Sequence, residues 1–384
     1  MAGLLFRGAA LADGRSAALE RGVSLLISDG KIAYLGPRDG EPDPGEAQIV
    51  DASGATIVPG LVDCHAHFTG LGGAHWIDRF GDPEDELLGR GPRAADALVR
   101  MGILAARDVG APRRLNLRIR DAVRGGRLAP TIVAAGTWIA RRDKFPPFVV
   151  FVDSPEQLLQ AALAELDAGA DLVKCAVDTG RTGDEVTFSV DELRPMVEAV
   201  HARDRKVAAH AQGKGAAIAA AAGVDSIEHG FGVDAGVAGT MAGHTALVPT
   251  LSVLASLVGF AATDGGRFAD ARPTSEALLE RALDAVRAAH AAGVRIATGS
   301  DFGGGSVRPG HLAWEVELLV RAGLAPHEAL GSATFVGGEL LGLPDAGRLR
   351  VGGPADCALV HGDPLSDPAA LWRVWLVVHD GVVV

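Results

Sequence analysis

Two histidines, His65 and His67, end an apolar run in the stretch IVPGLVDCHAHFTG. If this run is a β-strand, residues two apart point to the same side, so the two imidazoles lie next to each other. Neighbouring imidazoles at a strand end can bind one metal ion. Buried histidines with ordinary hydrogen bonds are also common, so the pair alone leaves both interpretations open.

Four more ionisable residues lie within or at the ends of later apolar stretches: Lys174 in DLVKCAV, His210 in KVAAH, His229 in DSIEH and Asp301 in RIATGSD. Taken singly, the lysine could extend to solvent, the histidines could be hydrogen-bonded core residues, and the aspartate could cap a helix. Their shared position at strand ends is harder to explain by four unrelated roles. This shared position favours a single site that all of these residues form together.

Lys174 is the most informative of these residues, because burying its ammonium inside an apolar strand is costly. That cost disappears if the amine is deprotonated and reacts with carbon dioxide to give a carbamate. A carbamylated lysine is a carboxylate-like ligand that can bridge two divalent metal ions. The two-residue period places Cys64 and Cys175 on the opposite side of their strands, where we expect them to pack in the core.

The elements that must position these residues alternate between apolar strands and Ala-rich amphipathic helices, for example SPEQLLQAALAELDAG with Ser154 as the expected N-cap. Such alternation predicts a parallel sheet covered by helices, and eight strands suggest a (β/α)8 TIM barrel, with chemistry at the carboxyl ends of the strands. We expect the strands near residues 57–64, 103–109, 131–136, 171–177, 206–210, 225–229, 246–250 and 294–300.

Both ends of the chain differ from this pattern. They carry short alternating strands with Asp-Gly hairpin signals at Asp29-Gly30 and Asp380-Gly381. The sequence therefore predicts an α/β protein with a small β-sandwich domain built from residues 1–54 and 345–384 and a barrel over residues 55–344. Residues 251–275 show no clear helix start, so we expect a loop there, long enough to act as a lid.

The amino-acid composition limits the kinds of partner that we expect this protein to bind. Hydrophobic residues make up 48% of the 384 residues and the formal net charge is -12, without a basic stripe, so a nucleic acid or an anionic membrane is disfavoured. The three cysteines lie far apart and form no disulfide framework, which fits a reducing compartment. The first residues do not resemble a signal peptide and no apolar run could span a bilayer, so we expect a cytoplasmic protein acting on a small molecule.

These motifs resemble the metal-dependent amidohydrolase superfamily over nearly the whole chain. PGLVDCHAHF is similar to its strand-1 signature, HAQG and SIEHG to those of strands 5 and 6, TGSD to that of strand 8, and AGRLRVGGPADCALVHGDPL to the return into the accessory β-sandwich. A strand-4 lysine together with SIEHG looks most like the prolidase-like, dipeptidase-related branch with a carboxylated lysine.

Carried over position by position, the resemblance implies two metal ions, usually zinc, with six ligands: His65, His67 and Asp301 for one ion, His210 and His229 for the other, and carbamylated Lys174 as the bridge. Metal coordination lowers the pKa of bound water to about 7, which provides hydroxide at neutral pH. Asp301 can orient that hydroxide and pass its proton to a departing amine. The expected reaction is hydrolysis of an amide or cyclic amide in a small molecule such as a dipeptide or N-acyl amino acid.

The sequence also departs from that branch. The one tyrosine, Tyr34, falls in the expected β-domain, so a tyrosine used near the substrate by related dipeptidases has no counterpart. After the third strand the chain reads AAGTWIARRDK where a glycine- and histidine-rich stretch is expected. Both differences weigh against a dipeptide substrate and leave the metal ligands untouched.

Four residues near the strand ends are candidates for substrate contacts: Trp138, Arg142, His75 and His311. Each also has an ordinary structural explanation, as a packed ring, a solvated loop residue or a helix cap. The competing functions are a mononuclear imidazolonepropionase-like hydrolase or deaminase, a lactone or phosphoester hydrolase, and a catalytically silent scaffold. A deaminase is disfavoured because HAQGKG offers Gln212 where a glutamate is expected, and apolar helix faces leave homo-oligomerisation open.

Overall fold

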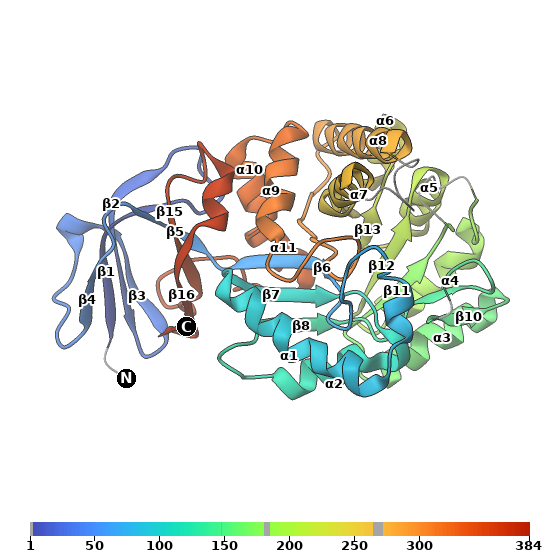
Figure 1. Cartoon of the computed structure of the whole chain (residues 1–384), viewed down its shortest axis with the longest axis horizontal. Helices are drawn as coiled ribbons and strands as arrows, with labels where there is room; N and C mark the ends of the chain where they lie inside the picture. The colour runs from blue at the N-terminus through green and yellow to red at the C-terminus, as the bar shows by residue number, and fades with distance from the viewer. Residues whose placement is uncertain (1–2, 147, 180–184, 264–271) are drawn as a thin grey trace.

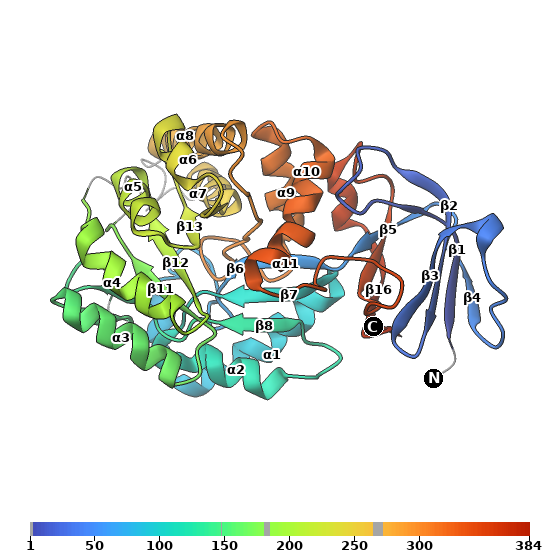
Figure 2. The ribbon, with the colours of Figure 1, turned by 180° about the vertical axis from the view of Figure 1, so that it is seen from behind.

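A sheet built from both chain ends lies beside a larger region of parallel strands and helices in the computed structural model (Figure 1), which describes residues 3–146, 148–179, 185–263 and 272–384. Figure 2 shows the same arrangement from behind, with helices covering the parallel strands. The chain thus has an α/β fold with parallel sheets, as expected.

The terminal sheet has the strand order β17-β16-β15-β5-β1-β2-β3, and β4 pairs with β1. Its strands are β1 (Leu4–Leu11), β2 (Glu20–Ser28), β3 (Lys31–Pro37), β4 (Gln48–Asp51), β5 (Ala55–Pro59), β15 (Cys357–His361), β16 (Val374–His379) and β17 (Val382–Val383). Antiparallel pairing of β5 with β15, with Ile57 opposite Leu359, joins the two ends of the chain. Asp29-Gly30 and Asp380-Gly381 connect hairpin strands at positive φ, as Asp-Gly turns require.

The expected first parallel strand, residues 57–64, is divided between two sheets. β5 belongs to the terminal sheet, and β6 (Leu61–Ala66) begins the parallel region after Gly60. A side chain at Gly60 would come within 2.8 Å of Leu104 Cδ1, so the chain changes sheets where only glycine fits closely. The nearly continuous apolar run in the sequence shows no sign of this division between two sheets.

The parallel strands form two ladders, β6-β7-β8 and β10-β9-β11-β12-β13-β14. Their bounds are β6 as above, β7 (Ile103–Asp108), β8 (Thr131–Ala134), β9 (Ile139–Arg141), β10 (Val150–Val152), β11 (Leu172–Ala176), β12 (Lys206–Ala211), β13 (Ser226–His229) and β14 (Ala246–Val248). Residues 294–300 make one parallel bridge, from Ile296 to Leu247, and Phe302 bridges Ala66. Residues 294–300 therefore form no regular strand, and the expected eighth strand is represented there by a single isolated bridge.

Helices connect and cover these strands. They are α1 (Glu84–Arg100), α2 (Leu115–Val123), α3 (Pro155–Asp167), α4 (Val190–His201), α5 (Gly213–Ala222), α6 (Ala235–Met241), α7 (Leu251–Thr263), α8 (Arg272–Ala291), α9 (Leu312–Arg321), α10 (Pro326–Ser332) and α11 (Phe335–Leu341), with short 3-10 turns η1 (Arg38–Gly40), η2 (Asp78–Gly81), η3 (Pro112–Arg114) and η5 (Pro368–Trp372). Ser154 caps α3 by accepting a hydrogen bond from the backbone N–H of Gln157, as expected.

The expected loop over residues 251–275 was wrong in its described parts, because residues 251–263 form α7 and residues 272–275 begin α8. The N-terminal N–H groups of α7 are not capped by a neighbouring residue. Instead the buried carboxylate of Glu315 in α9 accepts from the backbone N–H of Leu251 at 2.9 Å and of Ser252 at 2.8 Å. This cap comes from about 64 residues away, so no local signal announces the helix. Residues 264–271 of the expected loop lie outside the described part.

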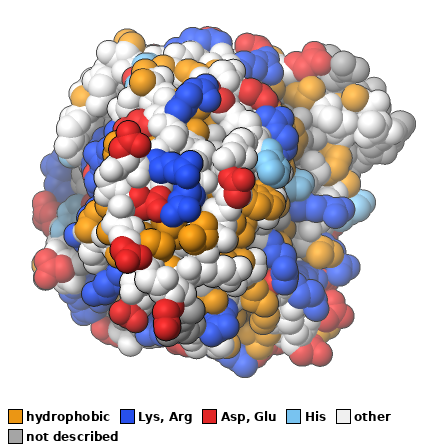
Figure 3. All heavy atoms as spheres, turned by 90° about the vertical axis from the view of Figure 1, so that its left-hand side faces the viewer, with side chains coloured by type: hydrophobic (Ala, Val, Ile, Leu, Met, Phe, Trp, Pro, Cys, Tyr) orange, Lys and Arg blue, Asp and Glu red, His pale blue; other side chains and the backbone are white. Residues whose placement is uncertain are grey.

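The end of the molecule formed by the terminal sheet carries charged side chains of both signs next to one another (Figure 3). In the described part of the chain, none of the helices combines the length and the apolar character needed to cross a membrane.

Candidate metal centre

Six side chains at the carboxyl ends of the parallel strands line one cavity of about 320 Å³: His65, His67, Lys174, His210, His229 and Asp301. His65, Lys174, His210 and His229 belong to β6, β11, β12 and β13, whereas His67 directly follows β6 and Asp301 directly follows residues 294–300. The parallel alignment of the strands brings their carboxyl ends to one edge, which is why residues up to 236 positions apart meet there.

The distances within this cluster suit ligands that share a metal ion. Asp301 Oδ1 lies 3.3 Å from His67 Nε2 and 3.6 Å from His65 Nε2. Two atoms that each lie about 2 Å from one tetrahedral ion are themselves about 3.3 Å apart. The ring centres of His65 and His229 are 5.0 Å apart, and those of His210 and His229 4.6 Å. Besides His65, His67 and Asp301, the cavity therefore holds a second group of candidate ligands, His210 and His229.

Hydrogen bonds fix three of the imidazoles through Nδ1 and leave Nε2 for the cavity. His65 Nδ1 contacts Glu228 at 2.7 Å, His67 Nδ1 the carbonyl oxygen of Gly110 at 3.0 Å, and His229 Nδ1 the hydroxyl of Thr250 at 2.7 Å. A partner on Nδ1 selects the tautomer whose Nε2 lone pair can bind a metal ion. The orientation of these rings fits ligation.

Two buried nitrogens in the cavity, Lys174 Nζ and His210 Nε2, have no hydrogen-bond partner among the described residues. Buried polar atoms are normally satisfied, so each such atom calls for a group that would complete it. Together with the donor atoms of the other histidines and Asp301, they fit divalent metal ions. The family resemblance and the local chemistry agree on this point.

Burial shifts the pKa values of several side chains in the cavity toward the neutral form. Desolvation lowers the pKa of Lys174 to about 8 and that of His210 to about 3, and it holds the pKa values of His65 and His229 well below their ordinary range. The neighbouring cationic groups lower these pKa values further. These shifts favour the neutral, metal-binding form of His65, His210 and His229 at neutral pH. In His67, by contrast, burial is outweighed by the charges of Asp301 and Asp108, which raise its pKa.

A buried ion pair beneath the cluster supports His65. Glu228 contacts His65 through one carboxylate oxygen, and its other oxygen accepts from Arg107 at 2.7 Å and from Ser226 at 2.5 Å. Arg107 in turn donates to the carbonyl oxygen of Cys64 at 2.6 Å. The expected site did not include Glu228 or Arg107. Their one signal in the sequence is a charged residue that follows apolar residues within a strand, Glu228 in SIEH and Arg107 in ILAARD.

Asp301 is held in position by a second buried carboxylate. Asp63 accepts from the backbone N–H and the hydroxyl of Ser300, at 2.9 and 2.5 Å, and from the N–H of His65 at 3.2 Å. Asp301 and His229 both have positive φ, 50° and 70°, which for residues other than glycine costs about 1–3 kcal/mol. Strained backbone at two proposed ligands is consistent with a functional site.

The rest of the cavity wall is mostly apolar and aromatic. Trp138 packs edge-on against His67, with ring centres 4.8 Å apart, and Phe145 lies 5.4 Å from His210. Phe148, Phe231 and residues from α7 complete the wall. These rings surround the polar cluster and limit the water that reaches it.

Of the four expected substrate contacts, Trp138 lines the cavity and the other three do not. Arg142 forms an ion pair with Asp153 at 2.8 Å on the surface. His75 is exposed, and His311 precedes α9 with its ring 5.3 Å from Trp372. The roles of all four in substrate binding stay predictions.

A sequence profile of the Amidohydrolase family matches residues 56–384, most of the chain and all of the six side chains above. The chain belongs to the amidohydrolase family.

Similar proteins support this assignment. An uncharacterized protein of Mycobacterium tuberculosis is 32% identical to this amidohydrolase over 369 residues, 94% of this chain and 92% of that protein. Ochratoxinase of Aspergillus niger is 28% identical over 408 residues, 92% of this chain and 82% of that enzyme. The crystal structure of a Xaa-Pro dipeptidase with bound methionine matches with a TM-score of 0.86 and 27% identity over the whole of both chains. This amidohydrolase is a hydrolase that acts on carbon–nitrogen bonds.

Proposed function

We propose that this amidohydrolase uses two metal ions to hydrolyse the C–N bond of an amide or cyclic amide in a small molecule, such as a dipeptide or an N-acyl amino acid. The observation that carries the proposal is the convergence of four imidazoles, one carboxylate and one buried lysine on a single cavity. Three or four ligands suffice for one ion, so six favour two.

The residues would divide between the two ions as follows: His65, His67 and Asp301 for the first, His210 and His229 for the second, and Lys174 between them. Divalent ions, most commonly zinc, would supply an activated water at neutral pH and polarise the scissile carbonyl group. Asp301 would accept the proton of that water on its carboxylate and deliver it to the departing nitrogen. The aromatic wall would hold the apolar part of the substrate and exclude bulk water.

Lys174 would act as a carbamate. Its neutral amine attacks carbon dioxide, loses a proton and becomes a carboxylate with two oxygen ligands. Burial of the amine supports this step, because the pKa lowered to about 8 makes the neutral form accessible near pH 7.

The decisive measurement is the metal content per chain of protein purified without chelator, for the wild type, Lys174→Ala and Lys206→Ala. Lys206 is a suitable control because it starts the neighbouring strand β12 and donates to the carbonyl oxygen of Leu340, away from the cavity. We expect two ions in the wild type and in Lys206→Ala, and one or none in Lys174→Ala. A carbamate carbon bound to Lys174 can be detected separately by ¹³C NMR after exchange with labelled bicarbonate.

The alternatives give other results. One ion in all three proteins would favour a mononuclear imidazolonepropionase-like hydrolase or deaminase. Two ions without cleavage of any amide would favour a lactone or phosphoester, since the same residues would serve those leaving groups.

The proposal also covers the closure of the barrel and the nature of the terminal domain. We infer that the parallel strands close into a (β/α)8 barrel, with residues 294–300 as the eighth strand. The bridges from Ile296 to Leu247 and from Phe302 to Ala66 support this closure. The terminal sheet would then be the small β-sandwich domain.

A further inference from the structure

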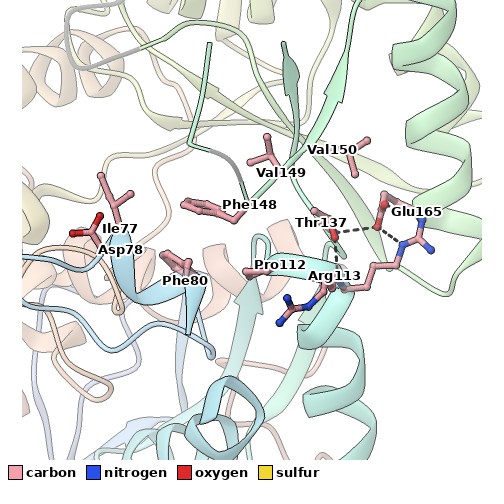
Figure 4. Close-up of a pocket in the computed structure, with 12 residues that line it drawn as sticks. Ile77, Asp78, Phe80, Pro112, Arg113, Thr137, Phe148, Val149, Val150 and Glu165 are labelled. Atoms are coloured by element: carbon pink, nitrogen blue, oxygen red, sulfur yellow. Dashed lines mark hydrogen bonds and ion pairs between the residues drawn. The ribbon is translucent and has the colours of Figure 1, made fainter. Parts of the chain in front are cut away.

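A second pocket, of about 570 Å³, is drawn in Figure 4, and it shares lining residues with the metal-centre cavity. We call it the outer pocket, and its apolar lining consists of Ile77, Phe80, Pro112, Phe148, Val149 and Val150. Ile77 and Phe148 line both spaces, so the outer pocket and the cavity meet at these side chains.

Phe80 completes the partition between the two spaces. Its ring centre lies 4.7 Å from that of Phe148, which lines both spaces, and 5.9 Å from that of His67 in the metal-centre cavity. The partition is therefore made of side chains carried by two connecting segments, the one around η2 and the one between β9 and β10. Side chains on such segments can rotate at less cost than strands can move.

The charged groups at the outer pocket already have partners. Glu165 accepts two hydrogen bonds from Arg114, at 2.9 and 3.0 Å, and one from the backbone N–H of Thr137 at 3.0 Å. Figure 4 marks the contact between Thr137 and Glu165 with a dashed line. Arg113 lies 3.4 Å from Glu84, and Asp78, the remaining charged residue of the lining, lies 3.5 Å from His75. The surface offered to a ligand is thus the apolar one, which fits an uncharged alkyl or aryl group.

The backbone beneath the pocket is strained. Arg113 and Arg114 both have positive φ, 53° and 58°, at a cost of about 1–3 kcal/mol each. The contact of the Arg114 N–H with the hydroxyl of Thr137, at 2.9 Å, holds this turn. Strain that is retained in the wall of this pocket is consistent with a turn whose shape serves a function.

We propose that the outer pocket is a second subsite for the substrate, which holds an uncharged alkyl or aryl arm of an elongated amide while the scissile C–N bond lies at the histidines. The inference rests on the proposed function and adds the substrate class. Short amides would fill the inner cavity alone, whereas a longer arm passes the Phe80 and Phe148 rings and buries further apolar area.

The test compares the metal-loaded wild type with Val150→Trp, which fills the outer pocket, and Val150→Ala, which enlarges it. The substrates are two series of neutral ω-phenylalkyl amides of increasing length, one extended on the acyl side and one on the amine side. In one series we expect kcat/KM to rise about threefold or more for each methylene group that enters the pocket. Val150→Trp should remove this rise without changing the shortest amide, and Val150→Ala should keep it.

Rates that do not depend on length in either series, or a Val150→Trp variant that affects all lengths equally with an unchanged melting temperature, would overturn the subsite and leave the hydrolase function intact. If none of the amides is cleaved, a binding measurement tests the subsite independently of the proposed hydrolase function. Calorimetric titration with 6-phenylhexanamide should then show binding to the wild type that is lost in Val150→Trp. Equal binding by both proteins, or by neither, contradicts the subsite.

Discussion

At the scale of single residues, the cluster depends on side chains that never touch a substrate. His65 is oriented by Glu228, which is itself neutralised by Arg107, and all three side chains are buried. A buried ion pair is costly unless it is fully hydrogen-bonded, and here the carboxylate has partners on both oxygens. The hydrogen-bond partners of a metal ligand orient it and contribute to metal affinity.

We therefore expect Glu228→Gln to weaken metal binding about 10- to 100-fold, because the amide removes the negative charge that strengthens His65 as a donor. The measurement is competition with a chromogenic chelator. Glu165→Gln is a matched control, since Glu165 is equally buried and paired with Arg114 but contacts none of the histidines. If both variants retain wild-type affinity, Glu228 has a structural role alone.

At the scale of secondary-structure elements, close approaches between strands place the ligands. β6 lies against the segment ending at residue 300, and Gly299 stands where the two meet. α7 forms one wall of the cavity, and its start is fixed by Glu315 of α9. The elements around the site are thus held by contacts between segments far apart in the sequence.

Gly299→Ala should displace His65, because a Cβ atom at this position would lie 2.5 Å from both His65 Cβ and Val248 Cγ1. We expect a loss of about 1–3 kcal/mol in the free energy of unfolding together with reduced metal content. Gly259→Ala in α7 is the control, since nothing lies within 4 Å of its Cβ position. Full metal content in Gly299→Ala would show that β6 can shift without harm.

Glu315→Ala should lower the free energy of unfolding by about 1–3 kcal/mol, because the backbone N–H groups of Leu251 and Ser252 lose their acceptor. Hydrogen exchange should increase first at the start of α7. The exposed pair of Glu280 and Arg321 provides the comparison, and we expect Glu280→Ala to change stability by less than about 0.5 kcal/mol. Equal effects of both variants would contradict the capping role.

At the scale of the whole molecule, His379 ties the terminal sheet to the parallel region. Its Nδ1 lies 3.0 Å from Asp356 and its Nε2 3.1 Å from the carbonyl oxygen of Ala129, just before β8. Both nitrogens face acceptors, so the ring is best satisfied as an imidazolium and has no lone pair for a metal ion. Although Asp356, His379 and Asp380 lie close together, this group serves as a clamp between the two regions.

The clamp predicts a pH dependence. Burial lowers the pKa of His379, but the hydrogen bond and charge of Asp356 outweigh it, so the pKa is raised above 6.5. A raised pKa contributes stability that is complete below the unfolded value of 6.5 and is lost as pH rises through the folded value. Urea unfolding should therefore show the wild type more stable than His379→Gln at pH 5.5, with the difference shrinking at higher pH. A constant difference across this range would contradict the clamp.

The sequence by itself identified the residues that meet in the cluster and predicted its chemistry. Periodicity placed strands near β6, β7, β8, β11, β12, β13 and β14, and it put the ionisable residues at their carboxyl ends, because side-chain alternation and parallel packing follow from local pattern. It also predicted that both chain ends form one sheet, since hairpin turns have local residue signals.

Only the tertiary structure decided what depends on contacts between distant segments. The break at Gly60 is set by Leu104, and the helix α7 is capped by Glu315. The partners of the histidine Nδ1 atoms and the outer pocket beside the cavity likewise arise where separate loops and strands meet. Such contacts leave no periodic trace in a single sequence, so residue types and spacing indicate the chemistry of this amidohydrolase, while its packing determines the shape that a substrate must fit.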